Sequence, residues 1–184
     1  MASKKVVLEG IANWAKVFES NRDKEGYKGA YADTNGRTTI ELILTQDEMD
    51  KLKKAGSMKR GRPVEGGISV KLDRKWETGR DWDSGAPEVF RADGNPWDEA
   101  TDGYIGNGST VRVQAVVTPF PDKGVTSTRL EMVKVLELVP FASADDGFRA
   151  DESGGVGQPK KDEAPVTAPA YAASTKDIDD SIPF

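Results

Sequence analysis

The chain has 184 residues and a formal net charge of -5, and it contains neither histidine nor cysteine. Without imidazole or thiolate groups it lacks the general base and nucleophile of Ser-His-Asp and Cys-His enzymes and the usual ligands of structural zinc. The absence of cysteine fits a reducing cytoplasm, and no apolar run is long enough for a membrane span or a secretory signal. We therefore expect a cytoplasmic, non-membrane protein with no metal and no cofactor.

Charge divides the chain into a body and a tail. Residues 1–143 carry 22 basic and 22 acidic side chains, whereas residues 144–184 carry 4 and 9, so the tail holds the whole net charge. The stretch from Asp151 to Lys176 has no periodic apolar pattern, and it cannot bury enough surface to offset its chain entropy. We predict a folded domain over 1–143, a disordered linker over 144–176 and a distinct tip over 177–184.

The first half of the body predicts two strands and a helix. Val6 to Phe18 is rich in apolar and β-branched residues, which indicates a long first strand, and Asn35-Gly36 marks a turn before a second strand, Thr38 to Leu44. Thr45 to Glu48 has the residue types and spacing of a capping box, which predicts one short helix that ends near Gly56.

Alternation of apolar and polar residues predicts further strands. Ile68, Val70 and Leu72 should face a core, while Ser69 and Lys71 should face water. The remaining predicted strands are Pro87 to Ala92, Ser109 to Thr118 and Thr126 to Val139. About six strands and one inserted helix indicate a mainly β fold. A small closed barrel of OB type satisfies this pattern because closure removes exposed edges, although periodicity alone also allows a sandwich.

Basic and aromatic residues gather in the middle of the body. Lys51 to Lys75 carries nine basic side chains against two acidic ones, whereas Glu77 to Asp102 carries eight acidic against two basic. Binding a single strand without reading its sequence needs cations for phosphates and flat aromatic faces for bases. The candidate residues for binding single-stranded DNA are Lys59, Arg60, Arg62, Lys71, Arg74, Lys75, Trp76, Arg80, Trp82, Arg91, Tyr104 and Arg112.

The aromatic residues also have a structural interpretation as core side chains. Trp76 continues the inward phase of the strand before it, so strict alternation places it inside the barrel unless a bulge reverses the register. Trp82 and Trp97 have polar neighbours whose burial would be costly, which favours an exposed or loop position for Trp82. A second stacking candidate is a loop that contains Tyr27 and Tyr31 together with Arg22, Lys24 and Lys28.

The tip differs from a tail that only solubilises. It combines acidic residues with apolar ones, which bring an aggregation risk and no folding benefit. A docking role explains this combination, with Phe184 in an apolar pocket flanked by basic residues and with the carboxylates steering the approach. The predicted partner-docking residues are Asp177, Asp179, Asp180, Ile182, Pro183 and Phe184.

Two segments resemble known families. The tip resembles the acidic, Pro-Phe-ended tail of bacterial single-stranded DNA-binding proteins, whose tips dock onto replication and repair enzymes. The body looks different from that family. Tyr104 to Val113, followed after Pro119-Phe120 by Leu130 to Phe141 and then by the acidic tail, resembles the phage-encoded single-stranded DNA-binding proteins of T7-like phages.

The resemblance to the phage proteins implies an OB-fold that binds single strands without sequence preference. It further implies a role in phage DNA replication, recombination and repair in the cytoplasm of the bacterial host. The expected partners are single-stranded DNA and, through the tail, replication and recombination proteins, and a homo-oligomer remains open.

A protein of another class would share some of these features. A β-barrel adaptor that binds proteins and never touches nucleic acid would need the tail but no basic, aromatic surface. An enzyme is not expected, because the chain lacks histidine and cysteine and has no phosphate-binding Gly-x-x-x-x-Gly-Lys-Ser/Thr loop.

Overall fold

The computed structural model describes residues 2–141, except for the side chain of Trp82. Its strands are β1 (Lys4–Lys16), β2 (Arg37–Leu44), β3 (Arg62–Val64), β4 (Gly67–Lys75), β5 (Glu88–Phe90), β6 (Ser109–Phe120) and β7 (Val125–Glu137). The α-helices are α1 (Gln46–Lys54) and α2 (Glu99–Asp102), and short 3-10 turns lie at η1 (Tyr27–Gly29), η2 (Ala32–Thr34), η3 (Asp81–Asp83) and η4 (Pro121–Lys123). The predicted linker over 144–176 and the tip over 177–184 lie outside the described residues.

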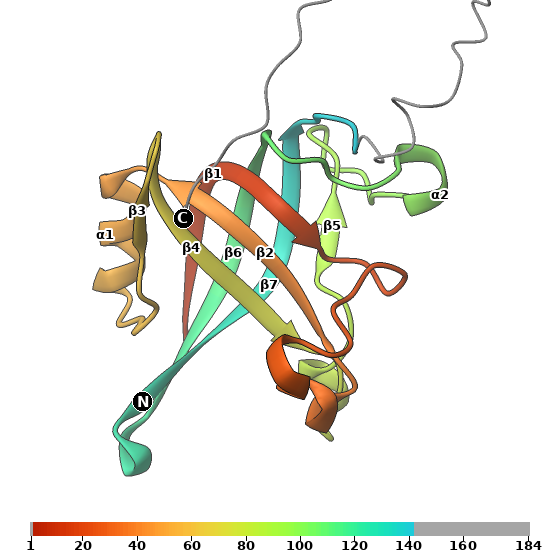
Figure 1. The fold of residues 1–184 in the computed structure, drawn as a ribbon. Coiled ribbons are helices and arrows are strands. Elements are labelled where there is room, and N and C mark those ends of the chain that lie inside the picture. The colour runs from red at the N-terminus through yellow and green to blue at the C-terminus, as the bar shows by residue number, and fades with distance from the viewer. Residues whose placement is uncertain (1, 142–184) are drawn as a thin grey trace, which may run out of the picture. The chain divides into compact units, whose positions relative to one another are not determined.

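The seven strands form one sheet in the order β3-β4-β2-β1-β6-β7-β5, antiparallel except where β5 runs parallel to β7. The long strand β1 pairs with β6 through Lys4 to Ala12 and with β2 through Gly10 to Lys16. Figure 1 shows the strands crossing one another around a common interior, and residues of β4 contact residues of β7. The prediction of a mainly β, OB-type barrel is confirmed.

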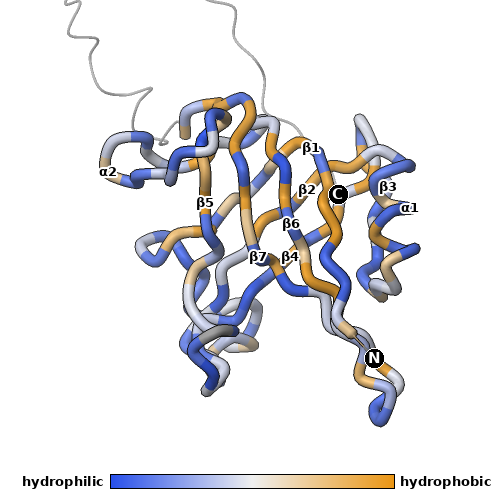
Figure 2. Tube along the Cα trace, turned by 180° about the vertical axis from the view of Figure 1, so that it is seen from behind, coloured by the Kyte–Doolittle hydropathy of each residue, from blue (hydrophilic) through white to orange (hydrophobic). Residues whose placement is uncertain are grey.

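Alternate positions of the strands fill the interior. Buried apolar side chains follow the predicted period of two in β6, where Val111, Val113, Ala115 and Val117 point inward. Along the strands in Figure 2, apolar positions alternate with polar ones. The amphipathic helix α1 adds Met49 and Leu52 to the core. Neither α-helix of the described residues is long and apolar enough to cross a membrane.

The structure corrects several local expectations. The sequence predicted neither the short strand β3, which pairs with β4, nor the helix α2. Ser69 is buried instead of facing water, and its hydroxyl donates a hydrogen bond to the Glu41 carboxylate. The capping box forms only in part. The Thr45 hydroxyl accepts the Glu48 N–H at 3.3 Å, whereas the Glu48 carboxylate accepts the Glu9 N–H at 3.1 Å and so ties α1 to β1.

Candidate nucleic-acid interface

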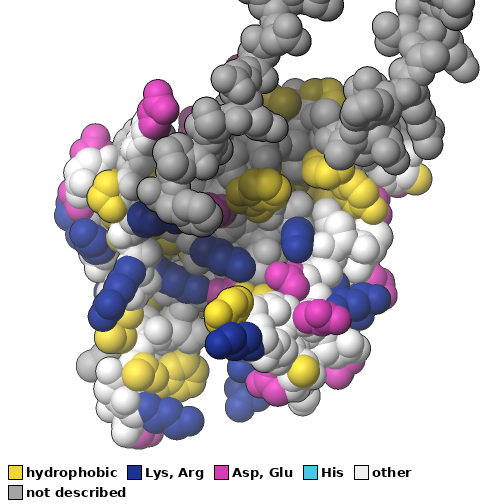
Figure 3. Space-filling view, viewed as in Figure 1, with side chains coloured by type: hydrophobic (Ala, Val, Ile, Leu, Met, Phe, Trp, Pro, Cys, Tyr) yellow, Lys and Arg dark blue, Asp and Glu magenta, His cyan; other side chains and the backbone are white. Residues whose placement is uncertain are grey.

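The outward-facing side chains of β2 and β4 form a continuous surface, which we call the β2–β4 face. Strand pairing sets Arg37 opposite Lys75 and Glu41 opposite Lys71. Because successive side chains of a strand alternate between faces, these four residues share one side with Thr39 and Asp73, while Ile40 and Leu72 point into the core. On this view of the molecule, Lys and Arg side chains gather over β2 and β4, with a few acidic side chains among them (Figure 3).

A cavity of about 820 Å³ opens at one end of the β2–β4 face, and we call it the first cavity. It extends from β4 to the hairpin of β6 and β7, where it includes the exposed ring of Phe120. Its basic lining residues are Arg37, Lys59, Arg74, Lys75, Arg80 and Arg129, and its acidic ones are Asp33, Asp73, Glu77 and Asp83. The excess of basic groups makes this cavity attractive to an anion.

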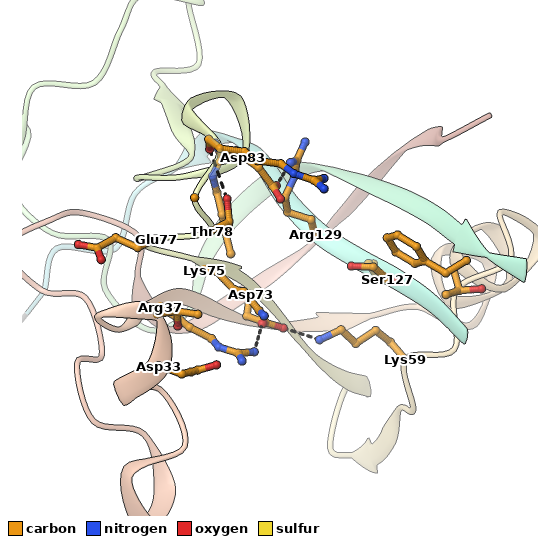
Figure 4. A pocket seen from close by; sticks show the side chains of 17 residues that line it. Asp33, Arg37, Lys59, Asp73, Lys75, Glu77, Thr78, Asp83, Ser127 and Arg129 are labelled. Carbon is orange, nitrogen blue, oxygen red and sulfur yellow. Dashed lines mark hydrogen bonds and ion pairs between the residues drawn. The ribbon is translucent and has the colours of Figure 1, made fainter. Parts of the chain in front are cut away.

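Asp73 orders two cations at the edge of the first cavity. Its carboxylate lies 2.8 Å from Arg37 Nη1 and 2.5 Å from Lys59 Nζ, and Figure 4 shows both side chains reaching toward it. Burial opposes ionisation of this carboxyl group, but Lys59 and Arg37 outweigh that effect and hold its pKa below the ordinary value of 3.8. The triad keeps a net positive charge in a fixed arrangement.

Two arginines of the first cavity act mainly within the fold. Arg74 points inward, is 9% exposed and donates from Nη2 to the Ser84 carbonyl oxygen at 2.8 Å, and its burial lowers the pKa of its guanidinium. Arg129 of β7 forms an ion pair with Asp83 of η3. Both side chains therefore join the segment after β4 to the barrel. Lys75 differs, because it is exposed and its ammonium pairs with no carboxylate in residues 2–141.

Tyr31 from the connection between β1 and β2 covers part of the β2–β4 face. The Arg37 guanidinium carbon lies 4.7 Å from the centre of its ring, and Lys71 Nζ lies 5.7 Å from it and donates to its hydroxyl at 3.3 Å. These cation–π contacts hold the ring between one cation of β2 and one of β4. Tyr27, in the same connection, is 80% exposed and has Lys28 Nζ 5.2 Å from its ring centre. The predicted pair Tyr27 and Tyr31 thus lies beside basic residues.

A smaller cavity of about 230 Å³, which we call the second cavity, lies near Tyr31. Lys71 lines this cavity and also contacts the Tyr31 ring. Its lining consists of Trp14, Lys16, Asp23, Thr39, Glu41 and Lys71. Trp14 is 67% exposed, which makes it a stacking candidate that the sequence did not indicate. Its signal was hidden because it falls within the apolar run from Val6 to Phe18, where an aromatic residue is typical of a core position.

The predicted aromatic residues occupy three different settings. Trp76 is half-buried beyond the end of β4, where strand alternation no longer applies, and the Arg22 guanidinium carbon lies 4.3 Å from its ring centre. Trp97 packs against the core and donates from Nε1 to the Gly103 carbonyl oxygen at 3.0 Å, despite its polar neighbours. Tyr104 also packs against the core, where its ring centre lies 6.0 Å from that of Phe18. Trp82 has its backbone in η3, and its side chain lies outside the described part of the chain.

The remaining predicted cations divide into two groups. Arg62 is exposed, 3.5 Å from Glu41, and therefore borders the β2–β4 face, while Arg60 is exposed in the preceding loop. Arg91 and Arg112 instead pair at 2.8 Å with Asp102 and Glu9, respectively, and neither lines the first or the second cavity. The structure thus brings Lys59, Arg62, Lys71, Lys75 and Arg80 to the face and its cavities and leaves Arg91, Tyr104 and Arg112 elsewhere.

Comparison with known proteins identifies solved structures whose fold is similar to that of this chain. No family model matches the chain, and no curated protein matches it in sequence. Among solved structures, gp2.5, a single-stranded DNA-binding protein encoded by bacteriophage T7, is similar with a TM-score of 0.51 and 16% identity, covering 85% of this chain and 100% of that chain. The single-stranded DNA-binding protein from bacteriophage Enc34 gives a TM-score of 0.47 at 14% identity, covering 82% and 88% of the two chains. Its complex with single-stranded DNA gives 0.46 at 12%, covering 76% and 89%. The expected likeness to phage proteins is confirmed at the level of the fold, which this chain shares with the T7 protein.

Proposed function

We propose that this protein binds single-stranded DNA without sequence preference along the β2–β4 face. One observation carries the proposal: Tyr31 lies on that face between Arg37 and Lys71, and cavities with further cations open beside it. Cations attract the phosphates of a strand, and aromatic rings accept any base by stacking. A protein adaptor would not need a surface on which aromatic rings alternate with ammonium groups, so this surface favours a nucleic acid as its ligand.

The chemistry of the face supports binding of single strands in particular. Phosphate contacts position a nucleic acid without reading its sequence, and stacking on a ring requires a base that is not already stacked in a duplex. The shared fold with a protein named as a single-stranded DNA-binding protein points the same way. We propose that the protein protects and organises single strands in phage DNA replication, recombination and repair, in the cytoplasm of the bacterial host, and that it is not an enzyme.

The acidic tail has a separate proposed role. We propose that residues 144–176 are a linker and that the tip, with Asp177, Asp179, Asp180 and Phe184, recruits replication and recombination proteins. The variant Phe184→Ala removes an apolar anchor and keeps every charge. It should abolish association with such proteins while leaving affinity for DNA nearly unchanged. Retention of the same partners by Phe184→Ala, measured by pull-down, would exclude this role.

Titration with oligo-dT, followed by tryptophan fluorescence, tests the DNA-binding proposal. Stacking near Trp14 or Trp76 should quench the emission, and a duplex of the same length should bind more weakly. The logarithm of the binding constant should fall with the logarithm of salt concentration with a slope of about -0.7 for each phosphate neutralised. An affinity that does not depend on salt, or a duplex bound as tightly as the single strand, would overturn the proposal.

A further inference from the structure

Trp14 combines an unfavourable backbone conformation with an exposed ring. Its φ angle is 49°, in the left-handed region that bulky L-residues rarely adopt. Its side chain is 67% exposed, so core packing does not compensate for the strain. Strained residues of this kind persist where the surrounding structure holds them, and they cluster at binding sites.

One turn holds the backbone around Trp14 in place. The pairing of β1 with β2 shifts register between Asn13 and Lys16, so Trp14 sits in a bulge. On one side of it, the Gly108 N–H donates to the Ala12 carbonyl oxygen at 2.9 Å, and at Trp14 itself the N–H donates to Asn107 Oδ1 at 2.7 Å. The turn before β6 therefore holds the backbone of the bulge at Ala12 and Trp14.

Trp14 lines the second cavity together with two cations, Lys16 and Lys71. Lys71 forms no ion pair within residues 2–141, and Lys16 has only a long pair, 3.9 Å, with Asp23. The two carboxylates of this cavity are held by neighbouring groups: Asp23 accepts the Gly26 N–H at 2.9 Å, and Glu41 accepts the Ser69 hydroxyl and lies 3.5 Å from Arg62 Nη2. The available chemistry is an aromatic face with two ammonium groups beside it.

We propose that Trp14 is a preformed stacking platform for one unpaired base and that Lys16 and Lys71 hold the phosphates on either side of that base. The cavity of about 230 Å³ is below the roughly 300–1,000 Å³ typical of sites for drug-sized ligands, which suits a single flat ring system. Asn107 is a positioning residue that acts through the Trp14 backbone. This inference rests on the proposed function and adds to it a specific subsite near Tyr31 on the β2–β4 face.

Replacement of Trp14 in the full chain separates binding from folding. Trp14→Gly removes the ring and relieves the left-handed backbone, since glycine adopts positive φ without steric cost. It should melt at a temperature no lower than that of Trp14→Ala, and it should bind oligo-dT about 5- to 150-fold more weakly than the wild type. Trp14→Phe should retain most of the affinity and lose part of the fluorescence quench, because phenylalanine stacks but does not emit like tryptophan.

A double-mutant cycle tests the role of Asn107. Asn107→Ala should weaken oligo-dT binding in the wild-type background and have no further effect in the Trp14→Gly background, because both changes act on one platform. Additive losses would show that Asn107 does not act through Trp14.

The outcomes distinguish this inference from the function on which it rests. If the wild type binds oligo-dT and Trp14→Gly binds it equally tightly, the platform is excluded and the proposed function stands. If Trp14→Gly loses affinity only together with a large fall in melting temperature relative to Trp14→Ala, the residue is structural and the platform is again excluded. If the wild type does not bind oligo-dT at all, the proposed function itself fails.

Discussion

The β2–β4 face and the region around α2 use the same residue types in opposite ways. On the face, Arg37 and Lys71 lie against the ring of Tyr31. Around α2, Arg91 is paired with the Asp102 carboxylate, and the rings of Trp97 and Tyr104 pack against the core. In the first region Lys71 forms no ion pair within residues 2–141, and Arg37 and Lys59 share the single carboxylate of Asp73, so a net positive charge remains beside an aromatic ring. The second region uses both charge and rings to hold its own structure.

This contrast shows that content of arginine and tryptophan does not locate a binding surface by itself. A carboxylate within ion-pair distance neutralises a cation that would otherwise attract phosphate. A ring that is packed against the core cannot receive a base. The partner of each cation and the exposure of each ring therefore decide which region binds, and substitutions in the two regions should have different consequences.

The largest difference is expected between Tyr31→Ala and Tyr104→Ala. Tyr31→Ala should weaken binding of oligo-dT by about 1–3 kcal/mol, because it removes a stacking ring, while thermal melting stays close to that of the wild type. Tyr104→Ala should instead lower the free energy of unfolding by about 2–4 kcal/mol, because its ring packs against Phe18 and the core. Fluorescence titration and urea unfolding measure the two effects. Equal losses of DNA affinity in both variants would remove the distinction.

Charge reversal on the β2–β4 face and at a site away from it gives the next largest contrast. Lys71→Glu places a carboxylate beside Tyr31 and should reduce affinity for oligo-dT by about tenfold or more at low salt. Arg112→Glu makes the same change in charge but lies next to Glu9 and outside both cavities, so its effect on affinity should be small. Titrations at two salt concentrations check the electrostatic origin, since the loss in Lys71→Glu should shrink as salt rises. Matching losses in the two variants would contradict the placement of the site.

Asp73→Asn should act in the direction of tighter binding. The substitution releases Arg37 and Lys59 from a shared carboxylate and should strengthen binding of oligo-dT by about 1 kcal/mol, or about fivefold, at low salt. It should also lower the melting temperature, because the two partly buried ion pairs of Asp73 with Arg37 and Lys59 are lost. A matched change, Asp102→Asn, removes the partner of Arg91 outside the face and should leave affinity nearly unchanged. If Asp73→Asn binds oligo-dT more weakly than the wild type, then the Asp73 carboxylate supports binding and does not hold the two cations back from the DNA.

The smallest expected effect is the dependence of stability on pH. The pKa of Asp73 is lowered in the folded state, chiefly because Lys59 and Arg37 overcome its burial. Its contribution to stability is therefore fully present above the unfolded-state value of about 3.9 and is lost as pH falls through the lower folded value. Between pH 7 and pH 3 the wild type should lose a few tenths to about 1 kcal/mol more stability than Asp73→Asn. Urea unfolding at both pH values measures this, and identical losses would exclude a stabilising role for the Asp73 carboxylate.

Much of the barrel could be predicted because its strands obey simple local rules. The alternation in β6 and the capping residue Thr45 specify which side chains face inward and where α1 begins, and the structure agrees on both. The short elements β3 and α2 could not be predicted, because β3 depends on pairing with β4 and α2 has only four residues.

The site was harder to predict for a related physical reason. Lys59, Lys71 and Lys75 lie within the basic block of the sequence, and the strand pattern explains their common surface. Arg91 and Arg112 looked equivalent in the sequence, but their carboxylate partners lie 11 and 103 positions away. Trp14 could not be recognised as exposed from the sequence, because it lies within an apolar run. Its position depends on the register shift in β1 and on the hydrogen bond with Asn107. Contacts between residues that are separated in the sequence decide these cases, and a single sequence does not show which residues form them.

Photocross-linking tests most directly the claim that the β2–β4 face is the binding surface. A 5-bromodeoxyuridine oligonucleotide would be irradiated with the full-length protein, and the modified residues would be mapped by mass spectrometry. We expect cross-links at Tyr31 and Trp14, with yields that fall as salt rises, and none at Trp97 or Tyr104. Cross-links concentrated at Trp97 and Tyr104, with Tyr31 and Trp14 unmodified, would contradict the account.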